Sequence, residues 1–197
     1  PSNTHRGTAN QDVRLRAMER PGQADHREAT PKPPAHDGSA ILWNVSGDQL
    51  RISSGQARGW LGDEGAAAGF GRMREALRQT EPPQGLAPKR PFWISELDLG
   101  DNKVGDAGVR ALVEALVQTH ASVDKLRLHK NRVGPAGAQA LTYLLDGPSV
   151  PPMELHLSHN FLPPPSVRAL LTAAARSPHY PRRPPGGRGQ PVPLWFR

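Results

Sequence analysis

The chain has 197 residues, of which 36% are hydrophobic, and it carries a formal net charge of +7 at pH 7. This length accommodates one or two domains, and its 22 prolines and 20 glycines predict much irregular backbone. The absence of cysteine excludes disulfides and thiolate metal ligands and is typical of a reducing compartment. No apolar run approaches the about 18 residues that a membrane span needs, and no apolar signal core is present. We therefore expect an intracellular protein, cytoplasmic or nuclear.

Residues 1–39 are polar, contain several prolines and mix both signs of charge. So little apolar surface cannot offset the entropy lost on ordering, and we expect a disordered leader or linker. Val13, Leu15 and Met18 would share one helical turn. A partner-binding helix over 11–19 is therefore the alternative.

Residues 40–90 are predicted to fold as a degenerate N-terminal repeat or cap, followed by a loop over 78–90. Residues 41–45 and 50–52 have the composition of strands. The segment Leu61-Gly-Asp-Glu-Gly65 resembles Val104-Gly-Asp-Ala-Gly108 further along, and terminal repeats of a solenoid are expected to be atypical. The glycines up to Gly71 superficially resemble a phosphate loop, but no Gly-Lys-Ser/Thr follows them, so no nucleotide site is predicted.

One stretch occurs three times between residues 91 and 175. Leu97-Asp-Leu99-Gly-Asp-Asn102 returns as Leu126-Arg-Leu128-His-Lys-Asn131 and as Leu155-His-Leu157-Ser-His-Asn160, with the asparagines 29 residues apart both times. Apolar residues at spacings of three and four follow each copy and predict a helix with one buried face. Since no unit can bury that face alone, the units must stack side by side.

Each position in the unit has an expected role. The two leucines alternate inward along a strand, and the asparagine can satisfy backbone groups where the chain leaves the strand. The glycines that follow suit open backbone angles or close packing against the helix. Asp106 is predicted to cap its own helix, while Pro135 and Pro164 suit a first helical turn.

The LxLxxN core, the Val104-Gly-x-x-Gly108 turn and Leu112-x-x-x-Leu116 resemble the leucine-rich repeat family. Specifically, they resemble its ribonuclease-inhibitor-like class, with repeats of about 28–29 residues. The resemblance covers roughly residues 91–175 and implies an α/β solenoid, with a parallel sheet on the concave side and helices outside. It also implies a binding role, since these repeats usually present a surface and perform no chemistry.

Residues 176–191 form an Arg/Pro/Gly-rich segment that we predict to be a loop. No acidic residue occurs after Glu154, so the formal positive charge is concentrated in this part of the chain. Residues 192–197 are predicted to begin a further repeat, with Leu194 and Phe196 at the repeated leucine positions. An uncovered parallel edge is a liability, so we expect either a piece of a longer protein or an element that covers Trp195.

The repeat also predicts rows of outward side chains, since neighbouring strands lie about 4.8 Å apart. The expected rows are Arg51, Asp98, Arg127, His156 and Trp195; Glu96, Lys125, Glu154 and Pro193; and Gly100, His129 and Ser158. Opposite charges alternate, and one hypothesis is a solvated face whose exposed pairs each contribute about 0–1 kcal/mol. The other is a protein-binding face, because Trp and Arg are favoured interface anchors. Its candidate residues are Asp98, Lys125, Arg127, His129, His156, His159 and Trp195.

Three of these candidates, His129, His156 and His159, also raise a zinc hypothesis, since imidazole is a common ligand. No cysteine and no nearby carboxylate completes a set of four ligands. We therefore predict surface histidines, with no metal and no cofactor.

The basic loop supports a nucleic-acid hypothesis. Arginines can neutralise phosphates and aromatic rings can stack on bases. The candidate contacts are Arg176, Tyr180, Arg182, Arg183 and Arg188. The prolines and glycines of the same segment are equally typical of a flexible insertion.

No nucleophile is placed beside a base, so we predict no catalytic residue and no enzyme. We expect a monomeric leucine-rich repeat module that binds another protein through its concave face. The alternative is an RNA-binding or RNA-associated recognition module of a larger protein that uses the basic 176–189 loop.

Overall fold

A computed structural model of the protein describes residues 41–46, 49–54, 59–79, 92–183 and 189–197. The predicted leader over 1–39, its alternative helix over 11–19, most of the loop predicted over 78–90, and Arg188 lie outside these residues. Within the described ranges, no helix is both long enough and apolar enough to cross a membrane.

In the described part of the chain, six strands form one sheet in chain order. They are β1 (Leu42–Ser46), β2 (Gln49–Ser53), β3 (Trp93–Asp98), β4 (Ser122–Arg127), β5 (Glu154–His156) and β6 (Trp195–Phe196). β1 and β2 pair antiparallel, and each later strand pairs parallel with the one before it. Parallel neighbours require a crossover between them, and each of the four connections here contains a helix.

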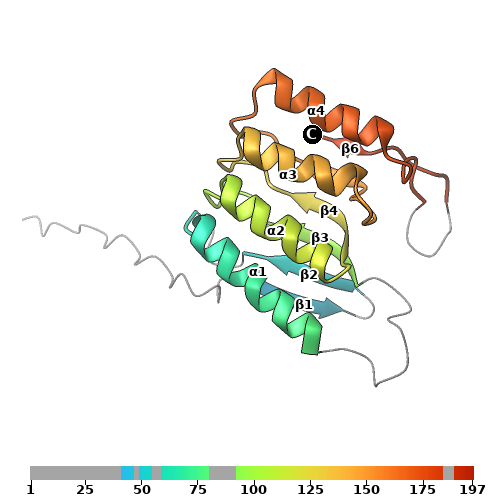
Figure 1. The fold of residues 1–197 in the computed structure, drawn as a ribbon. Helices are drawn as coiled ribbons and strands as arrows, with labels where there is room; N and C mark the ends of the chain where they lie inside the picture. The colour runs from blue at the N-terminus through green and yellow to red at the C-terminus, as the bar shows by residue number, and fades with distance from the viewer. Residues whose placement is uncertain (1–40, 47–48, 55–58, 80–91, 184–188) are drawn as a thin grey trace, which may run out of the picture. The chain divides into compact units, whose positions relative to one another are not determined.

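The helices of the described residues form the second layer. α1 (Gly62–Gln79), α2 (Asp106–Gln118), α3 (Pro135–Asp146) and α4 (Pro164–Arg176) lie side by side along one face of the sheet (Figure 1). Each helix contacts the next one along the chain. This arrangement confirms the predicted α/β solenoid of leucine-rich repeat type, with a parallel sheet in one layer and helices in the other.

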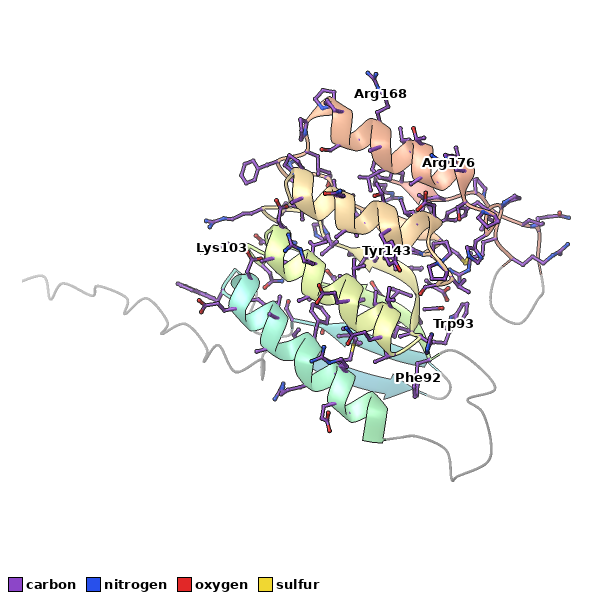
Figure 2. The ribbon with its side chains drawn as sticks, viewed as in Figure 1. Phe92, Trp93, Lys103, Tyr143, Arg168 and Arg176 are labelled. Atoms are coloured by element: carbon purple, nitrogen blue, oxygen red, sulfur yellow. The ribbon has the colours of Figure 1, made fainter. Side chains whose placement is uncertain are left out.

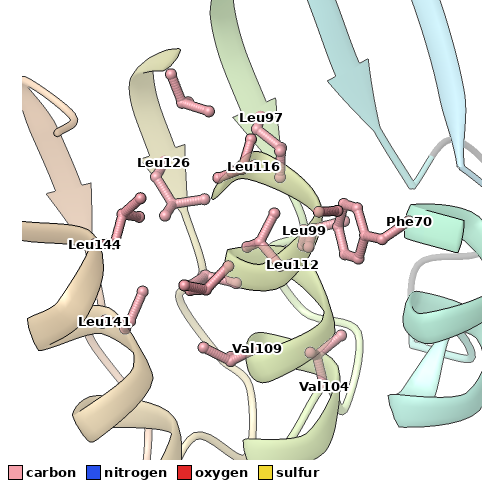
Figure 3. Close-up of a cluster of buried hydrophobic side chains, with 14 of the residues drawn as sticks. Phe70, Leu97, Leu99, Val104, Val109, Leu112, Leu116, Leu126, Leu141 and Leu144 are labelled. Atoms are coloured by element: carbon pink, nitrogen blue, oxygen red, sulfur yellow. The ribbon is translucent and has the colours of Figure 1, made fainter. Parts of the chain in front are cut away.

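The repeated leucines line up along a common seam. Leu97 is paired with Leu126 and Leu126 with Leu155, and all three side chains are fully buried. Helix residues such as Leu112 and Leu116 close the same core, which continues to Phe70 of α1 (Figure 3). Burying a leucine contributes about 1.5–3 kcal/mol, so a unit separated from its neighbours would lose most of its stability.

The asparagines form a ladder between neighbouring units, as predicted. Asn131 Oδ1 accepts hydrogen bonds from the backbone N–H groups of Asn102 (3.0 Å) and Val104 (2.9 Å) of the unit before. Asn131 Nδ2 donates to the carbonyls of Leu99 (2.8 Å) and Leu128 (3.1 Å). Asn160 repeats both kinds of bond one unit later. One short amide thus satisfies backbone groups on two turns of the solenoid.

Asp106 does not cap its own helix, so that prediction is wrong. Its carboxylate instead accepts a hydrogen bond from Gly134 N (2.6 Å), at the start of α3. Asp63 does the same one unit earlier, accepting from Gly105 N (2.5 Å) and Gly108 N (2.9 Å) at the start of α2. A carboxylate at a helix N-terminus satisfies free N–H groups and complements the helix dipole, so each of these helices is capped by the preceding unit.

The glycines of the turn allow this close approach. A Cβ on Gly108 would lie 2.8 Å from Asp63 Oδ1 and 2.7 Å from Val104 Cγ1. Neither Gly105 nor Gly108 has a positive φ, so close packing, and not open backbone angles, explains the glycine. Left-handed backbone occurs instead one residue before each asparagine, at Asp101, Lys130 and His159.

Candidate functional site

The central rows of the outward face have the predicted register. Glu96 pairs with Lys125 and Lys125 with Glu154, while Asp98 pairs with Arg127 and Arg127 with His156. The two leucines of each unit point to the helices, so these polar side chains lie on the opposite face. The face of the sheet that the helices leave uncovered is therefore built mainly from charged residues and histidine.

Both ends of the rows differ from prediction by two residues. Arg51 of β2 lies beside Glu96, not Asp98, and Trp195 of β6 lies beside Glu154, not His156. Because side chains alternate with a period of two, a slip of two residues keeps each one on its predicted face. The neighbours nevertheless change. Arg197, which the sequence analysis did not select, takes the place beside His156, where its N–H donates to the Leu155 carbonyl.

The charge pairing also differs from the prediction. Arg127 does not bond to Asp98 but forms a diagonal ion pair with Glu96, with 3.1 Å between Nε and Oε1. Asp98 Oδ1 accepts a hydrogen bond from Gly100 N at 2.8 Å and so is used by its own turn. Arg127 remains about a third exposed, so its guanidinium is held in place yet still accessible to a partner.

His129 and His156 form a stacked pair on this face. Their ring centroids are 4.6 Å apart and the rings are inclined by 20°. The His129 ring lies against Gly100, where a Cβ would come within 2.2 Å of its Cε1 atom. Gly100 therefore leaves free the space that the His129 ring occupies. His156 Nε2 is 2.9 Å from Ser158 Oγ, which fixes the orientation of the second ring.

Burial lowers the pKa of His156, and the neighbouring His129, Arg197 and Arg127 lower it further, while Glu154 raises it. His159 is not part of the pair, since it lies exposed in the turn after β5. Among the residues that the structure describes, no three histidine, aspartate or glutamate side chains are grouped so as to hold a metal ion. The zinc hypothesis therefore has no ligand set in the described structure.

Trp195 is 57% exposed at the end of the sheet. The guanidinium of Arg197 lies 4.2 Å from the centre of its ring. Lys125 is exposed in the same row of side chains. The predicted residues on β4, β5 and β6 thus lie within three neighbouring strands, whereas Asp98 belongs to the strand before them.

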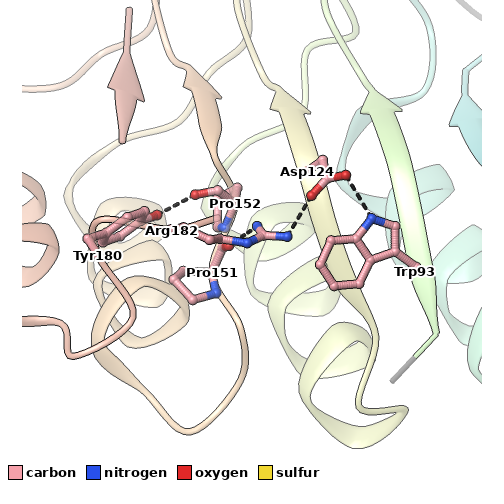
Figure 4. A network of polar contacts seen from close by, with 6 residues as sticks. All are labelled: Trp93, Asp124, Pro151, Pro152, Tyr180 and Arg182. Carbon is pink, nitrogen blue, oxygen red and sulfur yellow. Dashed lines mark hydrogen bonds and ion pairs between the residues drawn. The ribbon is translucent and has the colours of Figure 1, made fainter. Parts of the chain in front are cut away.

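The basic loop differs most from its prediction. Arg182 is only 6% exposed, and its guanidinium contacts Asp124 Oδ1 at 2.6 Å, the carbonyl of Pro151 and the ring face of Trp93 (Figure 4). Trp93 Nε1 donates to the second oxygen of Asp124 at 2.7 Å. We name Trp93, Asp124 and Arg182 the buried ionic cluster. Burial lowers the pKa of Arg182, and Asp124 opposes this effect.

Tyr180 is also directed inward. Its hydroxyl donates to the carbonyl of Pro152, and burial raises the pKa of that hydroxyl. Tyr180 and Arg182 are therefore engaged by the protein itself and do not present the free ring and free cation that the nucleic-acid hypothesis required. Arg176 and Arg183 are exposed, and Figure 2 shows Arg176 at the end of α4. Of the four predicted contacts that the structure describes, these two have the expected exposure.

No sequence pattern predicts the buried ionic cluster. Two of its members come from strand starts and the third from the loop, so no spacing within the repeat connects them. One signal was present: Asp124 precedes Lys125 in the strand and therefore alternates inward, where a carboxylate requires a partner.

A family model described as Leucine Rich repeat matches residues 91–113, which contain β3, the turn after it and the first half of α2. No curated protein matches the chain. The match covers the unit in which the seam leucines, Asn102 and the capped start of α2 have just been described. The chain therefore carries a leucine-rich repeat, within an α/β solenoid of that type.

Proposed function

We propose that this chain is a non-enzymatic module that binds another protein through the uncovered face of its sheet. The observation that carries the proposal is the gathering of accessible anchor residues on β4–β6. Arg127, Trp195 and Arg197 are of the types enriched at energetic hot spots, and the stacked histidines lie among them. A leucine-rich repeat supports the coarser conclusion of an interaction module.

The helix layer and the sheet face differ in a way that favours the sheet face as the binding surface. The exposed side chains of the helix layer include Tyr143, which is 52% exposed, and the arginines of α4 that Figure 2 labels. On the sheet face, by contrast, Arg127 is held by Glu96 and His156 by Ser158. Pre-organised side chains lose less entropy on binding, so the sheet face is the better prepared surface.

Photocrosslinking at matched positions tests this proposal. A photoreactive amino acid replaces exposed Lys125 on β4 in one variant and exposed Gln139 on α3 in the control variant. We expect a protein adduct from the first position that Trp195→Ala or Arg127→Ala abolishes. Adducts from Gln139 alone, or adducts at Lys125 that neither substitution weakens, would contradict binding through the sheet face.

The competing hypothesis, RNA binding by the basic loop, predicts a different response. Its affinity should fall steeply with salt and should depend on Arg176 and Arg183. A protein interface with a few buried anchors should change modestly over the same range. If Arg176→Ser with Arg183→Ser leaves RNA retention unchanged, the basic loop has no role in it.

Three finer points belong to the same proposal. The repeats are of the ribonuclease-inhibitor-like class, with a length of about 28–29 residues. The module acts as a monomer, and it works inside the cell. Size-exclusion chromatography with light scattering checks the second point, and localisation of a tagged chain checks the third.

A further inference from the structure

The stacked histidines are surrounded by cations. Arg127 lies beside His156 in the next strand on one side, and Arg197 follows the edge strand on the other. Glu154 is the carboxylate on the strand of His156 itself, and Asp98 of β3 is used by the N–H of Gly100. A carboxylate brought to this point would meet two arginines and two imidazoles, and the opposing charges of Glu154 and of Glu96, which is already paired with Arg127.

We propose that the His129–His156 pair is the part of the sheet face that receives an acidic side chain of the partner protein, and that binding is coupled to proton uptake. This inference rests on the proposed function and names the chemistry of the partner. Two protonated rings 4.6 Å apart repel each other and the flanking arginines. A carboxylate placed over them removes that penalty, so it favours the protonated state that an empty site disfavours.

The geometry supports such a receiving site in a second way. His129 Nδ1 is buried and makes no hydrogen bond within the described structure, while the ring as a whole stays partly exposed. The His129 ring is held between Gly100 and the ring of His156. The pair is therefore already in place before a partner arrives, and only its protonation changes.

Charge placement favours an acidic peptide over a nucleic acid. Three carboxylates, Glu96, Asp98 and Glu154, are interspersed among the cations of the same face. A phosphate backbone carries negative charge at every step and would meet each of them. A peptide can place one carboxylate at the histidines and neutral or basic residues elsewhere, which fits the mixed face.

Linkage gives the expected pH dependence. If binding takes up one proton, affinity rises by up to about tenfold per pH unit below the pKa of the bound state and above that of the free state. By reciprocity, the ligand raises the pKa of His156 by the same coupling free energy. Neutral histidine predominates at about pH 7.5 and protonated histidine below about pH 6, so this range contains the effect.

The probe is a fluorescently labelled hexapeptide with a single glutamate among serine and glycine residues, measured by anisotropy at about pH 7.5 and about pH 6 at constant ionic strength. We expect at least about fivefold tighter binding at the lower pH. The double variant His129→Gln with His156→Gln should lose this pH dependence. His120→Asn is the control, because His120 is exposed in the turn before β4, and it should keep the dependence.

Each outcome decides the inference. Equal affinity at both pH values, or a pH dependence that survives the double variant, overturns it, provided that thermal melting shows the variant folded. Tighter binding of an oligouridylate than of the single-glutamate peptide, with the same dependence on the two histidines, overturns the assignment to an acidic peptide. Histidine ring NMR supplies a direct readout, in which the single-glutamate peptide should raise the pKa of His156.

The failure of this inference differs from failure of the proposed function. A crosslinked protein partner at Lys125 whose capture is independent of pH would refute the coupling to histidine and leave the sheet-face function intact. Absence of any adduct at Lys125 that depends on Trp195 or Arg127 would refute the function itself.

Discussion

The asparagine ladder and the buried ionic cluster connect neighbouring units in opposite ways. The ladder uses one residue type at one position of each unit, and Asn131 and Asn160 make the same bonds to successive turns. The cluster occurs once and joins Trp93, Asp124 and Arg182, which lie up to 89 positions apart along the chain. Repetition therefore provides the general stacking of the solenoid, while a single long-range ion pair fastens the C-terminal loop to its side.

The largest effect should come from the ladder. Asn131→Ala removes the acceptor for two backbone N–H groups and the donor for two carbonyls. Each buried group left without a partner costs about 1–3 kcal/mol, so we expect a loss of about 4 kcal/mol in the free energy of unfolding, measured with urea.

Asn131→Asp is the second variant. It keeps the acceptor but places a buried carboxylate against the Leu99 and Leu128 carbonyls, so at neutral pH it should destabilise at least as much as Asn131→Ala. If both variants unfold at the urea concentration of the wild type, the amide is not what connects the units.

The cluster gives the next effect. Arg182→Met leaves the Asp124 carboxylate buried without its cation, and breaking a buried pair costs about 3–5 kcal/mol. We expect about 3 kcal/mol by urea unfolding because Trp93 Nε1 still donates to Asp124. The double variant Asp124→Leu with Arg182→Met should be more stable than Arg182→Met alone. A strictly additive double variant would show that the two side chains do not interact.

A smaller effect concerns a backbone conformation that recurs in each unit although the residue type at that position does not. Asp101, Lys130 and His159 differ chemically, yet all three adopt left-handed backbone at the same place in the unit. A β-branched residue there is strained by about 1–2 kcal/mol, so Lys130→Val should destabilise by that amount in thermal melting. Arg132→Val, at an exposed neighbour without positive φ, is the control and should be nearly neutral.

The smallest effect concerns pH. Since burial and neighbouring cations lower the pKa of His156 in the folded protein, the unfolded chain binds that proton more readily. The free energy of unfolding should therefore fall as pH decreases through about 6.5, the range of an ordinary histidine. His156→Gln should flatten this part of a stability-against-pH curve. A slope unchanged by His156→Gln would assign it to other groups.

The contrast also explains what could be predicted from the sequence. The leucine seam and the asparagine ladder follow from residues that recur at a constant step, and the structure confirms both. Each copy of the repeat predicts the same structural role for the same position, so a wrong prediction in one unit does not affect the others.

Features that occur once could not be found in this way. For β2 and β6, the observed strand register differs by two residues from the predicted one, because the sequence there has no asparagine to fix the register. Arg182 looks like its exposed neighbour Arg183, and only the folded positions of Trp93 and Asp124 distinguish the two. The His129–His156 stack likewise needs the missing Cβ of Gly100, which lies in the turn after β3.

The carboxylates of Asp63 and Asp106 make the order of the units along the solenoid matter. Each one serves the helix that follows its own, and the place of Asp106 is taken by Pro135 in the next unit. The second and third helices thus need a specific predecessor, whereas the fourth is released from this requirement. Rearranged versions of the protein should therefore tolerate a new unit in front of α4 more readily than one in front of α2 or α3.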